Sequence, residues 1–195
     1  NVGVSGGGTN IFRGHDNVQG ATDVGPNPDS LPGYYGIAPG SWAHWANVWN
    51  IDLDWLKKRF ASDAMMTKPG TTVSRWIDAV LEPNDAIGQG PNLRAVFYWG
   101  HAPNSQTRGL EMKKAMDALD LLVVVDPYPS ATAAWAAMPS PEGMKINPNR
   151  AVYLLPAATQ FETSGSVTAS NRSVQWREKV IEPLFESRTD HAIML

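Results

Sequence analysis

Eight residues near the start of the chain combine side chains that bind small anions. The segment reads Arg13-Gly14-His15-Asp16-Asn17-Val18-Gln19-Gly20 and follows a run of three glycines. A guanidinium is planar, keeps its charge at every working pH and forms two parallel charge-assisted hydrogen bonds with a carboxylate. The amides of Asn17 and Gln19 add donors and acceptors for an oxygen-rich ligand. The pattern therefore predicts binding of a small anionic or heavily oxygenated molecule.

Polar residues also gather where predicted strands end, and ligands of open parallel sheets bind beyond the carboxyl ends of the strands. The first such loop follows residues 95–98. It can offer backbone N–H groups, hydroxyls and a following helix N-terminus to a phosphate. It lacks the GxGxxG and GK[ST] spacings, so an ordinary strand–helix turn is the alternative. Its candidate residues are Gly100, His101, Pro103, Asn104, Ser105, Gln106 and Thr107.

Two further loops have a similar character. Asp126 and Pro127 directly follow a run at 121–125, and a carboxylate there can accept N–H bonds from a guanine edge or bind ribose hydroxyls. Ser130 can contact a phosphate or cap the next helix, and a turn-and-cap role is the alternative for Asp126. Residues 155–176 form a long polar run without apolar periodicity. Such a loop is usually functional or disordered, and its amides, hydroxyls and arginine suit a polar heterocycle with phosphates.

These loops need a framework, and the apolar pattern after residue 92 predicts one. Continuous apolar runs predict buried strands at 95–98, 121–125 and 151–155. Helices are expected at 110–119 and 131–137. Strand–helix–strand order predicts a parallel sheet with right-handed crossovers, so the fold class is α/β, a Rossmann-like parallel sheet with flanking helices. The helix at 110–119 should bury Met112, Ala115, Met116 and Leu119 and turn Glu111, Lys113, Lys114 and Asp117 to the other side.

The first 92 residues read differently. Residues 1–40 are rich in glycine and proline and should be loops, with room for a short helix at 18–24. Residues 41–82 should be helical. Ser41 is expected to cap one helix and Asp52 a second, and a third should run over 73–81. The first of these carries Trp42, Trp45 and Trp49 near one face. The predicted organisation is a loop-rich segment at 1–40, a Trp-rich helical insertion and linker at 41–92, an α/β segment at 93–170, and a continuation into a neighbouring domain at 171–195.

Composition excludes several classes of protein. The 195 residues carry a net charge of -3, which allows a substantial core but provides no basic stripe for nucleic acid. There is no apolar run long enough for a membrane span. The chain has no cysteine, so this segment forms no disulfide, thiolate metal site or iron–sulfur ligation. His44, His101 and His191 lack metal-ligand spacing, so we expect no metal ligand here. The ends of the chain suggest an internal piece of a longer polypeptide.

The segment at Arg13 resembles the Arg-Gly-His/Gln-x-Asn-Val-Gln-Gly segment in the large catalytic subunit of molybdenum- or tungsten-dependent formate dehydrogenases. The three loops are similar, in the same order, to the nucleotide-phosphate loop, the guanine-reading Asp and the last signature of the wider molybdopterin oxidoreductase family. The four matches cover most of the chain apart from about residues 41–92. The third loop's match is carried by Leu155, Pro156, Glu162, Gly165, Asn171, Arg172 and Gln175, with Thr159 as a further cofactor-binding candidate.

This resemblance implies a molybdenum or tungsten bis(molybdopterin guanine dinucleotide) centre that oxidises formate to CO2 by hydride transfer. Its metal-bound selenocysteine or cysteine and an adjacent His would lie upstream of this segment. Arg13 maps onto the substrate arginine, and His15, Asn17 and Gln19 are expected at the substrate channel or a pterin. The segment 171–195 is expected to contact the cofactor as it continues into a neighbouring domain. The parent subunit should hold a 4Fe–4S cluster that this segment does not ligate. An iron–sulfur electron-transfer subunit and a membrane cytochrome subunit are the expected partners.

Two features most resemble the exported, membrane-associated enzymes. They are the presence of His15 in the segment that begins at Arg13, and the Trp-rich insertion. This favours a bacterial protein on the periplasmic side of the inner membrane, although soluble relatives leave the cytoplasm open. Three alternatives remain. One is a family member that acts on nitrate or a sulfoxide. Another is a non-catalytic α/β nucleotide-binding module. The third is a Trp-rich sugar-binding domain, which should be mostly strands. We expect the tryptophans instead to pack against other parts of the subunit.

Overall fold

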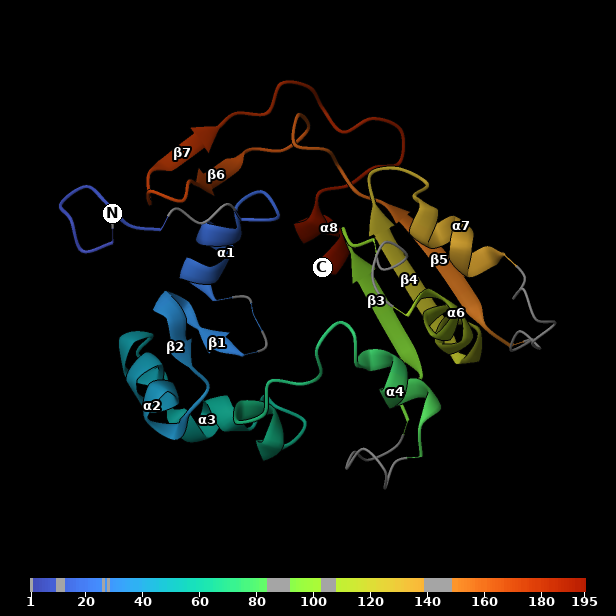
Figure 1. Cartoon of the computed structure of the whole chain (residues 1–195), viewed down its shortest axis with the longest axis horizontal. Coiled ribbons are helices and arrows are strands. Elements are labelled where there is room, and N and C mark those ends of the chain that lie inside the picture. Colours follow the sequence, from blue (N-terminus) through green and yellow to red (C-terminus); the bar gives the residue numbers. More distant parts are fainter. Residues whose placement is uncertain are drawn as a thin grey trace. The chain divides into compact units, whose positions relative to one another are not determined.

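The computed structural model describes residues 2–9, 13–25, 27, 29–83, 92–102, 108–138 and 149–195 (Figure 1). These residues form two compact units. The first comprises Asn1–Gly70 and Gly165–Arg177, and the second comprises Thr71–Ser164 and Glu178–Leu195. The four segments predicted from the sequence remain a prediction. The two units differ from them chiefly in joining Gly165–Arg177 to the first unit.

The second unit is built on a parallel sheet, as the sequence predicts. Strands β3 (Ala95–Trp99), β4 (Leu121–Asp126) and β5 (Ala151–Pro156) lie in this order, with Val96 beside Leu122 and Val124 beside Leu154. The expected helices α6 (Gly109–Ala118) and α7 (Ala131–Ala137) follow β3 and β4 (Figure 1). The chain therefore has a mixed α/β fold, in which the carboxyl ends of three parallel strands lie at one edge.

Only the central strand is buried on both faces. Leu122 and Val124 join a core formed with α6, α7 and helix α4 (Trp76–Leu81), whereas Val123 and Val125 face Ala157 and Ile193. Ile193 belongs to α8 (Asp190–Met194), which Thr189 caps. The prediction that all three strands are buried is wrong for β3 and β5. Each has a neighbour on one side only, and Phe97 is 60% exposed.

Helix α6 differs from the predicted amphipathic pattern in one respect. Met112, Ala115, Met116 and Leu119 are buried as predicted, but Lys113 and Asp117 are also buried, each 1% exposed. Because α4 and α7 both contact α6, its polar side is covered as well. Lys113 Nζ lies 2.5 Å from Asp117 Oδ1, and Arg150 Nη1 lies 2.8 Å from the same oxygen. The two charges predicted to face solvent thus form a buried cluster with Arg150.

The first unit combines short helices with two hairpins. The predicted helix at 18–24 is present as α1 (Val18–Val24) and ends at Gly25, whose φ of 80° suits glycine. Asp52 caps α3 as predicted, because its side chain accepts the Trp55 N–H at 2.7 Å. Ser41 does not cap α2, which begins at Pro39 after Ala38, since proline is favoured in the first helical turn. The other elements of this part are β1 (Ser30–Leu31), η1 (Pro32–Tyr34), β2 (Tyr35–Gly36), α2 (Pro39–Val48), α3 (Leu53–Lys57) and η2 (Asp63–Met66).

The tryptophans of α2 pack within their own unit. Trp42 is buried against Leu31 and Met66, and its Nε1 donates to the Met66 carbonyl at 2.6 Å. Trp45 and Trp49 have ring centroids 5.4 Å apart, and Trp49 remains exposed. The expected packing against other parts of the subunit is therefore not needed for Trp42. The helices here also argue against the sugar-binding alternative, which required mostly strands.

The prediction of one long loop over 155–176 is wrong in its second half. Strands β6 (Gly165–Thr168) and β7 (Val174–Arg177) form an antiparallel hairpin, in which Val167 pairs with Gln175. Both strands have four residues, and β7 is largely exposed. Backbone pairing rather than apolar burial holds the hairpin, so it leaves no alternating apolar signal in the sequence.

Candidate functional site

Arg13 lies in the first unit, just before α1, and its exposed guanidinium is held by one side chain. Arg13 Nη2 donates to Gln19 Oε1 at 2.5 Å. Gln19 is only 1% exposed, and its Nε2 donates to Asp23 Oδ1 at 2.9 Å and to Tyr34 Oη at 2.5 Å. A buried amide that uses both ends is a rigid support. The remaining N–H groups of Arg13 have no partner among the residues that the structure describes.

Asn17 joins α1 to the hairpin. It has a φ of 57°, and its Oδ1 accepts the Thr168 N–H of β6 at 2.9 Å. Gly20 makes this approach possible, because a Cβ there would lie 2.2 Å from Asn17 Oδ1 and 2.9 Å from Thr168 Oγ1. Asn17 therefore has a structural role, and its predicted contact with a pterin or substrate would have to use its other amide atom.

A cavity of about 290 Å³ lies between the start of α1 and the end of β6. It brings together Arg13, His15, Asn17 and Gln19, the four predicted residues of this segment, and His15 is exposed there. Its volume is enough for a small anion with its water. The full lining is Arg13, His15, Asp16, Asn17, Val18, Gln19, Val167, Thr168, Ala169 and Ser170.

The hairpin carries four of the predicted cofactor-binding residues. Arg172, at a φ of 68° in the turn, lies with Nη1 3.9 Å from Asp23 Oδ1 and Cζ 5.6 Å from the centroid of the Tyr34 ring. Asn171 Oδ1 accepts the Ser173 N–H, and Gln175 is exposed on β7. These residues belong to the unit that contains Arg13. Gly165, the first residue of β6, is also part of this unit.

In the second unit, predicted residues lie at the carboxyl edge of the sheet. Asp126 ends β4, and its Oδ1 accepts the Tyr128 N–H at 3.1 Å. Gly100 follows β3 with a φ of 56°, and the His101 carbonyl accepts from Thr132 Oγ1 at 3.1 Å. The other predicted phosphate-loop residues, Pro103, Asn104, Ser105, Gln106 and Thr107, lie outside the described residues.

Arg108 follows that predicted phosphate loop, but its guanidinium is already engaged. It bonds Asp78 at 2.8 Å and Glu111 at 2.6 Å, while Arg75 also contacts Asp78 at 2.5 Å. The hydrogen bond from Arg108 is the largest influence that lowers the pKa of Asp78 below its ordinary value of 3.8. These ion pairs join α4 to the start of α6. Arg108 is therefore a structural residue rather than a candidate phosphate ligand.

Glu162 is buried and joins two segments that are distant in the sequence. Its Oε2 accepts the Thr159 N–H at 2.6 Å, and its Oε1 accepts the Leu184 N–H at 2.7 Å. The bond from Thr159, followed by that from Leu184, lowers the pKa of this carboxyl below its ordinary value of 4.5. Because both oxygens bond to backbone groups, Glu162 shapes the site, and a direct cofactor contact would have to share these oxygens.

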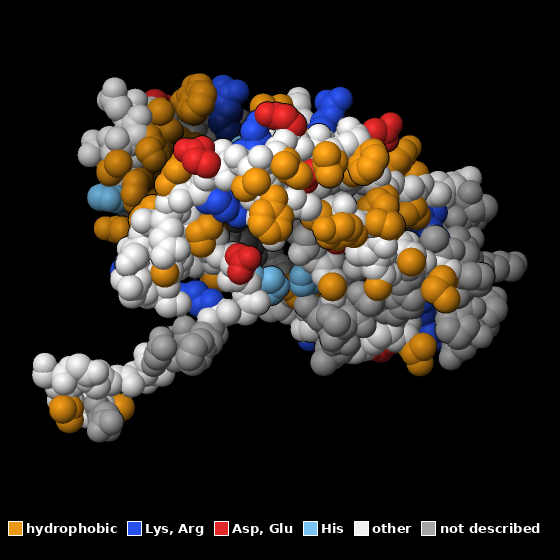
Figure 2. All heavy atoms as spheres, turned by 90° about the horizontal axis from the view of Figure 1, so that it is seen from above, with side chains coloured by type: hydrophobic (Ala, Val, Ile, Leu, Met, Phe, Trp, Pro, Cys, Tyr) orange, Lys and Arg blue, Asp and Glu red, His pale blue; other side chains and the backbone are white. Residues whose placement is uncertain are grey.

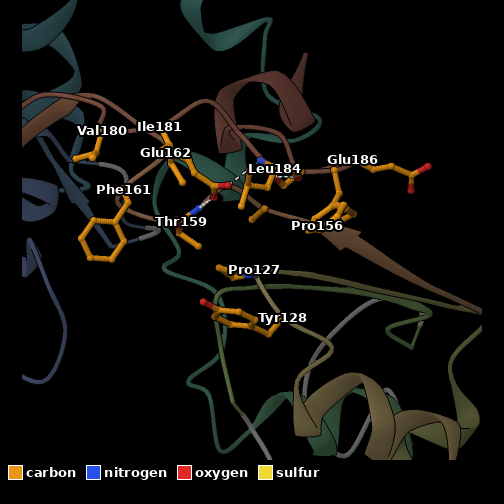
Figure 3. A pocket seen from close by; sticks show the side chains of 13 residues that line it. Pro127, Tyr128, Pro156, Thr159, Phe161, Glu162, Val180, Ile181, Leu184 and Glu186 are labelled. Atoms are coloured by element: carbon orange, nitrogen blue, oxygen red, sulfur yellow. Dashed lines mark hydrogen bonds between the residues drawn. The ribbon is translucent and has the colours of Figure 1, made fainter.

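These segments surround a cavity of about 860 Å³ (Figure 3). In this view Pro127 and Tyr128, from the loop after β4, lie across the cavity from Phe161 and Glu162. The cavity falls in the size range of organic ligand sites. Its lining is mainly apolar and consists of Pro127, Tyr128, Pro156, Ala157, Thr159, Phe161, Glu162, Val180, Ile181, Leu184, Phe185, Glu186 and Ser187.

The wall formed by residues 180–187 lies within the segment 171–195 that was expected to contact the cofactor, but none of its residues was predicted individually as a site residue. Its sequence signal is weak, with apolar residues at Val180–Ile181 and Leu184–Phe185 on either side of Pro183. Val180 and Phe185 are strongly exposed, and the space-filling view in Figure 2 shows hydrophobic side chains spread over the face drawn there. Contacts between residues far apart in the sequence bring this segment to the cavity: the Val180 N–H donates to the Phe161 carbonyl at 2.8 Å, and the Arg188 N–H donates to the Pro156 carbonyl of β5 at 3.1 Å.

The polar groups near this cavity are compatible with a nucleotide-bearing cofactor. Ser130 Oγ is buried and has no hydrogen-bond partner among the described residues, so its predicted capping of α7 does not occur through the side chain. Asp126 uses Oδ1 for the turn, which leaves Oδ2 for a ligand donor. An orphaned hydroxyl and a carboxylate oxygen at one sheet edge fit a ligand that has both a polar heterocycle and hydroxyl or phosphate groups.

No group of three or more His, Cys, Asp or Glu side chains among the described residues is arranged to hold a metal ion. In the same part of the chain, no helix has the length and apolar character needed to cross a membrane.

The chain is similar to molybdopterin-dependent oxidoreductases of known name. Residues 146–195 match the molybdopterin oxidoreductase family. The formate dehydrogenase subunit alpha of Megalodesulfovibrio gigas is 29% identical over 94% of this chain, which covers 20% of that protein. The F420-dependent formate dehydrogenase subunit alpha of Methanocaldococcus jannaschii is 29% identical over the whole chain, which covers 24% of its length. For formate dehydrogenase H of Escherichia coli the identity is 28% over the whole chain and 23% of that protein.

The chain thus spans about a fifth to a quarter of the length of these curated relatives. The similarity to formate dehydrogenases extends over both units, well beyond the C-terminal match to the family model. Residues 146–195 therefore resemble the molybdopterin oxidoreductase family, and the chain is similar along its length to formate dehydrogenase alpha subunits.

Proposed function

We propose that this chain is part of the catalytic subunit of a formate dehydrogenase, which oxidises formate to CO2 or catalyses the reverse reaction. The observation that carries the proposal is the exposed guanidinium of Arg13, held by Gln19 beside a small polar cavity. Relatives named formate dehydrogenase support the choice of formate over nitrate or a sulfoxide. A nucleotide-binding module without catalysis would have no need of this arrangement.

Arg13 is the proposed substrate residue. Its unpaired N–H groups can hold the two oxygens of formate by parallel charge-assisted bonds, while Gln19 retains one Nη2 hydrogen. Positioning of this kind accelerates a reaction by removing the orientational freedom of the bound substrate. His15 and Asn17 line the same cavity and would limit the approach of larger anions. When bound, the molybdenum or tungsten centre supplies the two-electron oxidation of the substrate.

We further propose that the cofactor is in the bis(molybdopterin guanine dinucleotide) form. In the second unit the residues that would hold one dinucleotide are Asp126 and Ser130, with Gly100, His101, Pro127 and Thr159 around them and Glu162 shaping the loop. In the first unit, Asn171, Arg172 and Gln175 are proposed separately as cofactor-binding residues. They lie on the hairpin that begins at Gly165. Pro103–Thr107 would bind a phosphate. No step of the reaction is assigned to these residues, whose proposed role is binding.

The remaining proposals concern the parent protein. We expect a 4Fe–4S cluster elsewhere in the same subunit, an iron–sulfur electron-transfer subunit and a membrane cytochrome subunit as electron acceptors. A periplasmic location in a bacterium is favoured over the cytoplasm. These proposals derive from the resemblance of the segment that contains His15 to the exported, membrane-associated formate dehydrogenases.

The test uses the full-length parent subunit as wild type, Arg13→Lys and Arg13→Ala. Metal and pterin contents are measured alongside formate-dependent dye reduction. We expect both variants to retain their cofactor and to lose activity by orders of magnitude, because lysine cannot form the bidentate contact. An Arg13→Ala variant with wild-type turnover would refute the substrate role. A wild-type protein without pterin would instead favour the nucleotide-binding module.

A further inference from the structure

We propose that Gln19 is the positioning residue for Arg13, and that it acts through a polar network running from Arg13 to Arg172. The inference rests on the proposed function, since it concerns how the carboxylate-binding guanidinium is held. Gln19 itself is buried and has no need to touch the substrate. Its role would be to fix one end of Arg13 before the anion arrives.

The chemistry of its neighbours determines the orientation of the Gln19 amide. A guanidinium only donates hydrogen bonds and a carboxylate only accepts them. The contact with Arg13 must therefore use Oε1, and the contact with Asp23 must use Nε2, as the structure has it. Reversing the amide would place a donor against Arg13 and an acceptor against Asp23. The amide thus has a single favourable orientation, and both of its Nε2 hydrogens are used because Tyr34 Oη takes the second.

The far end of the network is also held. Asp23 Oδ1 lies 3.9 Å from Arg172 Nη1, and the Arg172 guanidinium lies over the Tyr34 ring with Cζ 5.6 Å from its centroid. Asp23 and Tyr34, which both accept hydrogen bonds from Gln19 Nε2, therefore contact the same cation in the hairpin turn. Charges alternate along this path, from the cation Arg13 through the amide to the anion Asp23 and the cation Arg172. Each member stabilises the orientation of the next.

This support matters because Arg13 is otherwise exposed and precedes the helix. An arginine side chain has many rotamers, and binding to a free one would cost conformational entropy. Gln19 removes part of that cost in advance by retaining Nη2. The other N–H groups then face the cavity in a restricted set of directions. Loss of the Gln19 contact should consequently weaken substrate binding more than it slows the chemical step.

The test compares Gln19→Met, Gln19→Glu and wild type in the full-length subunit. Gln19→Met keeps the length of the side chain but removes the acceptor, and KM for formate should rise about 10- to 100-fold, with a smaller change in kcat. Gln19→Glu introduces a carboxylate that pairs with Arg13 and competes with the anionic substrate, so its KM should rise further. Thr22→Val on the same helix, which removes only the bond from Oγ1 to the Val18 carbonyl, should leave both constants unchanged.

A binding measurement separates this inference from the proposed function. Formate should raise the melting temperature of the wild-type and Thr22→Val proteins, and this shift should be lost in Gln19→Met at the same formate concentration. Wild-type KM and a wild-type melting shift in Gln19→Met would overturn the positioning role while leaving Arg13 as the substrate residue. A wild-type protein with cofactor but neither formate turnover nor a formate-dependent shift would overturn the proposed function and this inference with it.

Discussion

Replacing Asp117 by asparagine should destabilise the second unit far more than replacing its neighbour Lys113 by methionine. Asp117 Oδ1 accepts from Lys113 Nζ at 2.5 Å and from Arg150 Nη1 at 2.8 Å, and all three side chains are at most 6% exposed. Asp117→Asn removes the negative charge that both buried cations contact. Lys113→Met leaves the Arg150–Asp117 pair intact and fills the same volume with an apolar chain.

The expected magnitudes follow from the cost of a buried, unpaired charge. Removing one partner of a buried ion pair typically costs about 3–5 kcal/mol, whereas an apolar replacement of similar volume is often close to neutral. We therefore expect Asp117→Asn to lower the local stability of α6 and β5 by about 3–5 kcal/mol, and Lys113→Met to lower it by less than about 1 kcal/mol. A difference of this size changes an opening equilibrium by about two orders of magnitude or more.

Hydrogen–deuterium exchange of the full-length protein measures this effect locally. Peptides from Gly109–Ala118 and Ala151–Pro156 should exchange much faster in Asp117→Asn and nearly at the wild-type rate in Lys113→Met. Peptides from α2 should be unchanged in both variants and serve as the internal control. Equal acceleration in the two variants, or none in Asp117→Asn, would refute the view that Asp117 neutralises two buried cations.

Two further predictions concern the two units separately. Gly20→Ala should place a Cβ 2.2 Å from Asn17 Oδ1 and disrupt the hydrogen bond from Asn17 to β6. We expect the first unit to lose about 1–3 kcal/mol of stability, and faster amide exchange in β6 should report this loss. Acidification should loosen the loop held by Glu162. The hydrogen bonds from Thr159 and Leu184 lower the pKa of Glu162 in the folded protein. The ionised carboxylate therefore stabilises the fold fully at a pH above its unfolded-state pKa near 4.5, and this stabilisation is lost as the pH falls through the lower folded-state pKa. Limited proteolysis after residue 178 should accelerate over that acidic window in the wild type, whereas Glu162→Gln should already be susceptible at neutral pH and show little pH dependence.

The sheet could be predicted because its signal is local. The run at 121–125 is continuous and apolar, the polar loops bound it, and the helices between strands have their own period. The same argument overestimated the burial of β3 and β5. Whether an apolar strand is central or at an edge depends on how many neighbours it has, and that is a property of the assembled sheet.

The burial of Lys113 and Asp117 could not be predicted in this way. Spacing placed them opposite the buried face of α6, which is where charges normally meet solvent. Their burial results from helices on both sides and from Arg150, which lies 33 residues from Asp117 in the sequence. The hairpin of β6 and β7 was missed for a related reason, since its strands are short, exposed and paired through the backbone.

The sequence alone determined the kinds of chemistry available to this protein. It contained an arginine in an amide-rich segment, polar loops after apolar strands, and an order of motifs that resembles the molybdopterin oxidoreductase family, because each of these is a property of residue types and of spacing along the chain. Only the tertiary structure decided which side chains contact one another. It placed Gln19 between Arg13 and Asp23 and bound Glu162 to Leu184, 22 residues away. Such pairings depend on distances in space between residues far apart in the chain, which no local pattern records.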